Sequence, residues 1–323
     1  MKNLRSLLPW LSALLLLGIT LYLMAFPGGF LTMLFRSFAV QFLFVIAGLA
    51  AYWLWRQQLS LVLVALVCIV LLQASLPPLL HFSSPPTEGT EALSVAHFNV
   101  LKYNLKRELT VAAARDTNAD VLSFQEIDSD WERALVKGLK DQFPYYVSVA
   151  RDQNCYGLAV FSKYPLKQVE EFYWKEMVNL QGSIQLPDRS IAFIASHTKA
   201  PTSPSNFRLR NDHLQLLAQR VRLLSGPTIT FGDYNIVPWD PAILDYGQQT
   251  ELMDSRKNLA STYPSWCAPL AIPLDYIFHS EELRCRAFNT ISGTGSDHLG
   301  VIGHYDWSET FLTQLQSTNH GRI

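Results

Sequence analysis

The first 81 residues contain no acidic side chain, and this region restricts the fold of the chain more than any other. Three uncharged apolar stretches lie within it, at residues 7–26, 38–55 and 59–80. Each approaches or exceeds the ~18–20 apolar residues that cross the hydrocarbon core of a bilayer. We therefore predict a membrane domain at residues 1–81 with three transmembrane helices.

Two other interpretations of these stretches exist. Lys2 and Arg5 precede the first stretch, as they would in a secretory signal, but no small-residue cleavage site follows it and two more stretches come after it. The later stretches could also be buried helices of a soluble core. The absence of acidic residues disfavours that interpretation, because soluble domains seldom lack them over such a length.

The few basic residues of this region predict its orientation. Lys2 and Arg5 lie before the first stretch and Arg56 lies between the second and third, against Arg36 alone between the first and second. The positive-inside rule then places the amino terminus in the cytoplasm. With three spans, we expect an integral protein of a plasma membrane, such as a bacterial inner membrane, whose catalytic domain is extracytoplasmic.

A linker and a second domain follow the apolar region. Residues 82–92 are rich in Pro, Ser, Thr and Gly without periodicity, which is typical of a linker. The domain at residues 93–323 is acidic: 22 of the 26 Lys and Arg residues and all 27 Asp and Glu residues lie after residue 82, a net charge of −5. This negative net charge disfavours tight nonspecific binding of duplex nucleic acid, although a net charge does not reveal a local basic patch.

The four cysteines constrain the chain little. No CxxC pair or zinc-ligand spacing is present. In an oxidising compartment, two of Cys155, Cys267 and Cys285 could form a disulfide; free buried thiols are the alternative.

Strand-like and helix-like segments alternate through the second domain. Three stretches have helical spacing of apolar residues, at 106–118, 130–143 and 207–224, and residues 128–130 form a plausible cap for the second. The pattern fits either two stacked sheets with helices outside or a single doubly wound sheet. Eight short segments rich in β-branched and aromatic residues are predicted strands, at 93–100, 121–127, 145–152, 156–164, 190–198, 228–235, 274–280 and 299–307.

Polar residues recur where these predicted strands end. Taken singly, each is most simply explained by the turn hydrogen bonds that Asn and Asp commonly make. Several at successive strand ends indicate a site at the edge of a rigid sheet. These residues are Asn99, Glu126, His197, Asp233, Asn235, Asp297 and His298.

Six short motifs carry a resemblance to a known family. In chain order across residues 95–301 they are HFNV, SFQEI, ASHT, FGDYN, LDYIF and GSDH. Together they resemble the endonuclease/exonuclease/phosphatase superfamily, the magnesium-dependent fold of DNase I-type nucleases, apurinic endonucleases, inositol-polyphosphate phosphatases and bacterial sphingomyelinases. The resemblance implies a four-layer α-β-β-α sandwich, DNase I-like, over nearly all of residues 93–323.

The chemistry of phosphate esters explains why such residues are needed. An anionic ester repels hydroxide, so hydrolysis needs a divalent cation, a group that activates water and donors for the developing charge. Mg²⁺ prefers oxygen ligands, and Mn²⁺ is a possible substitute. Glu126 fits as the principal ligand with Asn99 and Asp297 beside it, and the absence of zinc spacing agrees.

The remaining motif residues have catalytic roles by resemblance. Asp233 and Asn235 are two residues apart, so in an extended segment both would face the same side. The resemblance implies that Asp233 orients or deprotonates the attacking water and that Asn235 holds a phosphate oxygen. Asp275 would pair with His298 and fix its tautomer, and His197 would donate to a phosphate oxygen.

We therefore expect a membrane-anchored phosphoesterase that hydrolyses phosphodiesters or phosphomonoesters by direct attack of water, since no Ser or Cys nucleophile occupies a motif. A lipid headgroup is the favoured substrate because of the bilayer attachment and the negative charge. A nuclease acting on DNA or RNA is the alternative, and a noncatalytic envelope module that keeps the fold is another. No obligate protein partner is evident. Trp239 and Trp266 either line the cleft or fill the core.

Overall fold

A computed structural model of the chain describes residues 2–76 and 91–313. By its internal contacts the chain divides into two compact units. One comprises Met1–Leu79 with Ile236–Leu244, and the other comprises Leu80–Asn235 with Asp245–Ile323.

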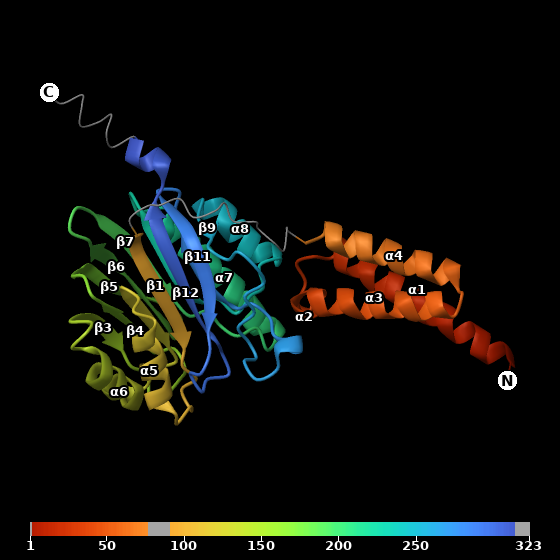
Figure 1. Cartoon of the computed structure of the whole chain (residues 1–323), viewed down its shortest axis with the longest axis horizontal. Helices are drawn as coiled ribbons and strands as arrows, with labels where there is room; N and C mark the ends of the chain where they lie inside the picture. The colour runs from red at the N-terminus through yellow and green to blue at the C-terminus, as the bar shows by residue number, and fades with distance from the viewer. Residues whose placement is uncertain (1, 77–90, 314–323) are drawn as a thin grey trace. The chain divides into compact units, whose positions relative to one another are not determined.

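The first unit contains four apolar helices: α1 (Lys2–Ala25), α2 (Phe30–Ser37), α3 (Ala39–Trp55) and α4 (Leu59–Ala74) (Figure 1). Leu7–Ala25 of α1 is long and apolar enough to cross a membrane. Helices α2 and α3 pass the same test only as a pair, and they are bent by 65° at their junction. Helix α4 has 16 residues and rises about 24 Å, short of the ~30 Å of a hydrocarbon core.

The prediction of three transmembrane helices was therefore wrong by the criterion of length. One described helix qualifies as a span, or two if the bent pair counts as one. The predicted stretch at 38–55 coincides with α3, but this helix has 17 residues and needs α2 to reach spanning length. The end of the third stretch and most of the predicted linker lie outside the described residues, and residues 91–92 already belong to a strand.

The second unit contains two six-stranded mixed sheets. In each, a single parallel pair, β1 with β2 and β7 with β8, is combined with antiparallel neighbours. The first sheet has the order β11 (Leu283–Ile291), β12 (Gly300–Trp307), β1 (Glu91–Asn99), β2 (Val121–Gln125), β4 (Leu158–Ser162), β3 (Tyr145–Val149). The second has the order β5 (Leu166–Trp174), β6 (Met177–Gln185), β7 (Ser190–Ser196), β8 (Thr228–Asp233), β10 (Asp275–His279), β9 (Met253–Asp254).

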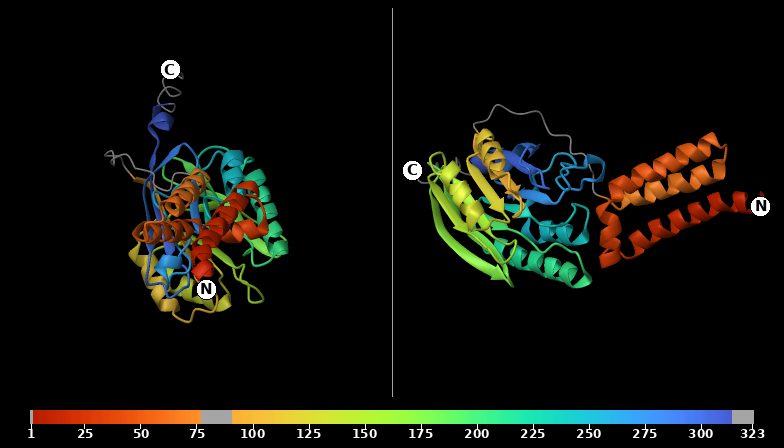
Figure 2. Two further views of the ribbon diagram at one scale, coloured as in Figure 1. Left: turned by 90° about the vertical axis from the view of Figure 1, so that its right-hand side faces the viewer. Right: turned by 90° about the horizontal axis from the view of Figure 1, so that it is seen from below.

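Helices cover the outer faces of the two sheets (Figures 1 and 2). Helices α5 (Arg107–Asp116) and α6 (Ser129–Leu139) pack on the first sheet, and α7 (Pro204–Val221) and α8 (Pro241–Thr250) lie against the second. Asp128 caps α6 as predicted, accepting a hydrogen bond from the Trp131 amide at 2.9 Å. Two mixed sheets flanked by helices are consistent with the expected DNase I-like sandwich, and the single doubly wound sheet is excluded.

Several elements escaped the sequence-based prediction. Strands β5 and β11 lie at sheet edges, and most of their residues are exposed or only partly buried, so neither shows the continuous apolar run of a central strand. Strand β11 also contains a register shift between Cys285 and Ala287. Strand β6 alternates apolar and polar residues, and helix α8 was not expected at all.

The side chains that face the opposite sheet change from apolar to polar along five of the central strands. The apolar members belong to one buried cluster between the sheets. Because side chains alternate with a period of two, the polar members two residues further on share this inner face. The series are Val95, His97 and Asn99 on β1; Val121, Ser123 and Gln125 on β2; Ala195 and His197 at the end of β7; Phe231 and Asp233 on β8; and Ile277 and Asp275 on β10.

Gly232 lies where the two sheets and the neighbouring strands β7 and β8 come close together at the polar end. The Gln125 side chain crosses between the sheets, donating to the Ser196 carbonyl at 2.6 Å and accepting from the Asp233 amide at 2.9 Å. A Cβ atom on Gly232 would lie 1.9 Å from Ser196 O and 2.5 Å from Gln125 Nε2. Only glycine fits between these groups.

We therefore expect Gly232→Ala to lower the free energy of unfolding by about 3 kcal/mol, since a backbone carbonyl cannot move aside. Urea unfolding of the full chain in detergent micelles measures this. Gly247→Ala is the matched control: its new Cβ would meet the nearest atom at 3.7 Å inside α8, so stability should rise by about 0.5 kcal/mol. Equal effects of the two substitutions would contradict the close approach at Gly232.

Candidate active site

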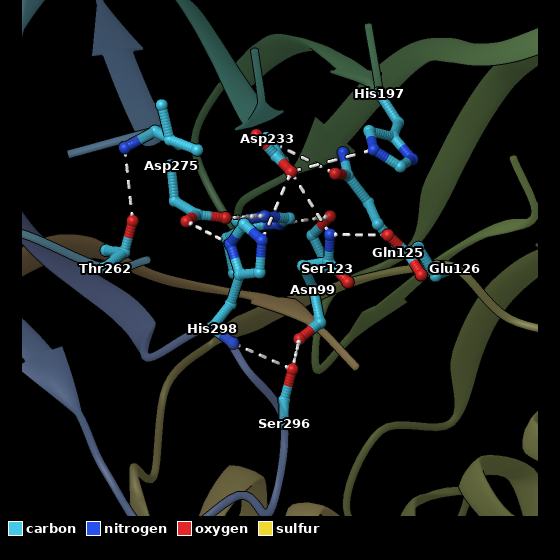
Figure 3. A network of polar contacts seen from close by, with 12 residues as sticks. Asn99, Ser123, Gln125, Glu126, His197, Asp233, Thr262, Asp275, Ser296 and His298 are labelled. Carbon is cyan, nitrogen blue, oxygen red and sulfur yellow. Dashed lines mark hydrogen bonds and ion pairs between the residues drawn. The ribbon is translucent and has the colours of Figure 1, made fainter. Parts of the chain in front are cut away.

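Asp233, the last residue of β8, occupies the centre of the polar cluster (Figure 3). It is buried, and its Oδ2 atom accepts a hydrogen bond from Asn99 Nδ2 at 3.2 Å. The same oxygen lies 3.7 Å from the Nε2 atoms of both His197 and His298. Three strand ends and the loop before β12 thus converge on one carboxylate.

The surroundings of Asp233 suit it to accept a proton. Burial raises its pKa to about 6, against the lowering effect of the His298 charge, and the Asp275 charge adds to the rise. A carboxyl group with a pKa near neutrality combines the ionised form with useful basicity.

His298 and Asp275 form the predicted pair. His298 Nδ1 lies 2.9 Å from Asp275 Oδ2, and both side chains are buried. Burial alone would lower the pKa of His298, but the charges of Asp275 and Asp233 and the hydrogen bond to Asp275 raise it to about 10. Burial would raise the pKa of Asp275, but the His298 charge and the hydrogen bonds from His298 and His97 bring it well below its ordinary value. The imidazolium form of His298 is therefore strongly favoured.

His197 is oriented from the backbone of a neighbouring loop. Its Nδ1 atom lies 3.2 Å from the Cys155 carbonyl oxygen, which leaves Nε2 toward Asp233. Lys102 holds this loop: its buried ammonium group donates to the carbonyl oxygens of residues 151, 152 and 154. Lys102 thus supports the orientation of His197 without contacting it.

The loop before β12 is tied to the first sheet through Ser296. Its hydroxyl donates to the Asn99 carbonyl at 2.8 Å and accepts from the His298 amide at 3.1 Å. The Tyr263 ring packs 4.8 Å from the His298 ring, between centroids. These contacts position His298 from both sides.

Asn235 reaches its position by a different geometry from the one expected. It follows β8 with a φ of 50°, so the period-two argument for an extended segment does not apply to it. Its amide donates to Asp233 Oδ1 at 2.8 Å in a tight turn, and its Nδ2 donates to the Thr198 carbonyl at 3.0 Å. The predicted contact of Asn235 with a phosphate oxygen stays a prediction.

Glu126 and Asp297 provide donors suited to a divalent cation. Both are only partly buried, and burial and the Glu126 charge raise the pKa of Asp297 against the lowering effect of His298. This repulsion between carboxylates would be relieved by a cation. Asn99 bridges Glu126 and Asp233 through its Nδ2, at 3.0 and 3.2 Å, and its Oδ1 accepts from the Leu101 amide. Its role as a ligand stays a prediction.

A second group of donors lies within 4.8 Å of one another: Asp233, Asp275 and His298. All three residues are buried, and each oxygen of Asp275 already faces a histidine nitrogen. Mg²⁺ retains several water molecules and prefers oxygen ligands. The partly exposed carboxylates of Glu126 and Asp297 fit it better than this buried, hydrogen-bonded group.

Sequence reasoning missed several residues of the site. Within the described residues these include His97, Ser123 and Gln125, which lie between the sheets, and Lys102 and Ser296, which shape loops. The first three share the inner face with residues that were predicted, so the period-two phase of β1 and β2 could have identified them. Ser296 belongs to the GSDH motif, whereas nothing in the local pattern marks Lys102.

The structure also decides between the alternatives left open for the two tryptophans and for the cysteines. Trp239 is buried, whereas Trp266 is exposed, so it does not fill the core. All four cysteines are free thiols in the structure, and the possible disulfide is not formed.

Comparison with known proteins identifies the fold and the family. The family model described as "Endonuclease/Exonuclease/phosphatase family" matches residues 96–298. This chain belongs to the endonuclease/exonuclease/phosphatase family. Members of this superfamily are generally phosphoesterases and typically depend on a divalent metal. No curated protein sequence matches this family member.

Solved structures agree on the fold of this family member. A humanized D. rerio TDP2 has 15% identity and a TM-score of 0.57, covering 66% of this chain and 98% of that one. Beta toxin from Staphylococcus aureus has 17% identity and a TM-score of 0.53, covering 65% and 99%. An endonuclease/exonuclease/phosphatase from Bacteroides vulgatus has 16% identity and a TM-score of 0.55, covering 67% and 99%. At these identities the likeness establishes the fold alone.

The His298–Asp275 pair should make the free energy of unfolding fall as pH rises into the alkaline range. Because the folded-state pKa of His298 is about 10 against an ordinary value of 6.5, its contribution is complete below about pH 6.5 and is lost as pH rises toward 10. The stability difference between the parent and His298→Gln should therefore shrink over this window. Pulse proteolysis in urea on the metal-free full chain measures it.

His279→Gln is the control for this measurement. Burial lowers the pKa of His279 to about 4, so its ring is neutral throughout the window and the difference should stay constant. A constant difference for His298→Gln as well would show that His298 is not held as an imidazolium.

Proposed function

We propose that this family member is a metal-dependent phosphoesterase in which water attacks phosphorus directly. The observation that carries the proposal is the buried Asp233 carboxylate, placed between the Nε2 atoms of His197 and His298 and beside Glu126 and Asp297. A proton acceptor, two histidine side chains and two partly exposed carboxylates at one sheet edge are the groups that such a reaction needs.

Each residue has a role that follows from its geometry. When bound by Glu126 and Asp297, a divalent cation such as Mg²⁺ would neutralise the charge of the phosphate oxygens. Asp233 accepts the proton of the attacking water, and Asn99 and the amide of Asn235 hold its carboxylate in place. His298, charged through its pairing with Asp275, donates to a phosphoryl oxygen.

Water is the favoured nucleophile because the thiol and hydroxyl groups nearby are unsuited to attack. Burial and the Glu126 charge raise the pKa of the Cys155 thiol, whose residue contacts His197 through its carbonyl. The Ser296 hydroxyl donates to a backbone carbonyl.

Substitution of the proton acceptor and of the metal ligand should have separable effects. With a bis-aryl phosphodiester and Mg²⁺, we expect Asp233→Asn to lower kcat of the full chain by about 10²–10⁴-fold because the base is lost. Its Mn²⁺ affinity, read by paramagnetic resonance, should remain. Glu126→Gln should lose both activity and Mn²⁺ binding.

Glu251→Gln, an exposed change at the opposite end of the second sheet, is the control and should retain both properties. Parental chain that neither binds Mn²⁺ nor hydrolyses any ester would instead favour a noncatalytic module that keeps the fold.

Membrane attachment is part of the same proposal. Helix α1 has the length and hydropathy of a span, and the basic residues around it favour a cytoplasmic amino terminus. A single crossing by α1 would leave the catalytic unit extracytoplasmic, as three crossings would, whereas a second span through α2 and α3 would return it to the cytoplasm. We propose that the chain crosses the membrane an odd number of times, so that the catalytic unit is extracytoplasmic.

We further propose that the substrate is a phospholipid-like amphiphile. Three large apolar side chains near the site are exposed: Tyr103 at 75%, Leu105 at 82% and Trp266 at 76%. Their loops are bound to the site, because the Lys102 amide donates to Glu126 and the Ser265 amide donates to the Asp297 carbonyl. An apolar rim around a phosphate-binding site favours a substrate with acyl chains.

This rim can be tested with two substrates. We expect Leu105→Ser with Trp266→Ser to lower the rate on phospholipid vesicles by about 10-fold or more, through lost apolar contact, while the rate on a soluble bis-aryl ester is kept. Leu223→Ser removes an equally exposed leucine, 81% accessible, beyond α7 and should change neither rate.

A nuclease is the competing outcome of the same measurement. A D. rerio TDP2 structure at 15% identity and a TM-score of 0.56 was solved with single strand DNA product, which is a statement about that protein. Cleavage of single-stranded DNA by this chain, unaffected by the rim substitutions and with no turnover of vesicles, would overturn the lipid assignment and leave the phosphoesterase assignment standing.

A further inference from the structure

His97 is a buried histidine that the proposed mechanism does not use. It lies on the inner face of β1, and its ring contacts both sheets. Nδ1 lies 3.3 Å from Ser123 Oγ of the first sheet, and Nε2 lies 3.2 Å from Asp275 Oδ1 of the second. Since Asp275 Oδ2 faces His298 Nδ1, each oxygen of this carboxylate has its own imidazole partner.

The partners of His97 define its tautomer. An ionised carboxylate can only accept, so the nitrogen facing Asp275 carries a proton. In the neutral ring the other nitrogen then accepts, and the Ser123 hydroxyl is the group placed to donate to it. Ser123, His97, Asp275 and His298 thus form one series of hydrogen bonds, in which the Asp275 carboxylate accepts from a histidine on each side.

We propose that His97 is a positioning residue for His298. A carboxylate held through one oxygen alone can rotate about its Cβ–Cγ bond. With Oδ1 bound by His97, Oδ2 has a defined direction, and this direction sets the plane of the His298 ring. The ring plane in turn places His298 Nε2 at 3.7 Å from Asp233 Oδ2. The kinetic consequence of the inference rests on the proposed function; the geometric consequence does not.

His279 separates positioning from a merely structural role. It is also buried and lies four residues further along the same strand as Asp275. Its Nδ1 atom lies 3.0 Å from the Met253 carbonyl and 3.2 Å from Ser255 Oγ, and none of its hydrogen bonds involves Asp275. Loss of either histidine should lower stability, but only loss of His97 should disturb His298.

The first measurement is kinetic, on the full chain with Mg²⁺ and the bis-aryl ester. We expect His97→Leu to lower kcat by about 10–100-fold with KM unchanged, the usual effect of removing a group that orients a functional residue. His97→Gln, which restores an N–H donor for Asp275, should recover most of the loss. His279→Leu should leave kcat per folded molecule as in the parent.

The second measurement needs no substrate. The Nδ1 proton of His298, hydrogen-bonded to a carboxylate, should give a low-field proton resonance that His298→Gln abolishes and thereby assigns. This resonance should shift in His97→Leu and stay in His279→Leu. If no ester is hydrolysed but the resonance shifts as described, the positioning role stands and the proposed function fails.

Ser123→Ala keeps the test decisive if His97→Leu does not fold. It removes only the hydroxyl that faces His97 Nδ1, so the chain should fold, with a smaller loss of kcat and a displaced His298 resonance. An unchanged resonance and unchanged kcat in Ser123→Ala, or in a folded His97→Leu, would overturn the proposal and leave His97 as a structural residue.

Discussion

The buried carboxylate of Asp275 is the group on which the rest of the site depends. A carboxylate without solvent is costly unless charges and donors surround it. Its donors come from different parts of the chain: His97 from the first sheet and His298 from the loop before β12. Meeting the needs of this one group therefore sets the spacing of the two sheets at their polar end. The geometry of the candidate site and the packing of the sheets therefore depend on the same hydrogen bonds.

The layer between the sheets serves two purposes along its length. Its apolar part, including Val95, Phe231 and Ile277, supplies the hydrophobic burial that holds the sandwich together. Its polar end replaces that burial with hydrogen bonds that cross between sheets, such as those of Gln125. Most of the hydrophobic stabilisation of the sandwich therefore comes from the part of the layer that is distant from the site. At the site itself, the polar groups are held in defined directions by hydrogen bonds.

Much of the site could be predicted from the sequence, because polar residues follow directly after several apolar strands that end at the same edge of the sheets. It could not give the left-handed turn at Asn235, since that conformation depends on the Asp233 side chain that accepts its amide. The edge strands β5 and β11 were missed because most of their side chains are exposed or only partly buried. The number of spans was overestimated because apolar composition alone does not fix where a helix ends.

The ammonium group of Lys102 sits among three backbone carbonyl oxygens, the surroundings that a bound alkali or alkaline-earth ion would find. Here the cation is covalently attached to the chain. Under the proposed function, a chelator would remove the cation held by Glu126 and Asp297 but would not loosen the loop that orients His197. The apo and metal-loaded forms should share one arrangement of this loop, ready to take up the ion without refolding.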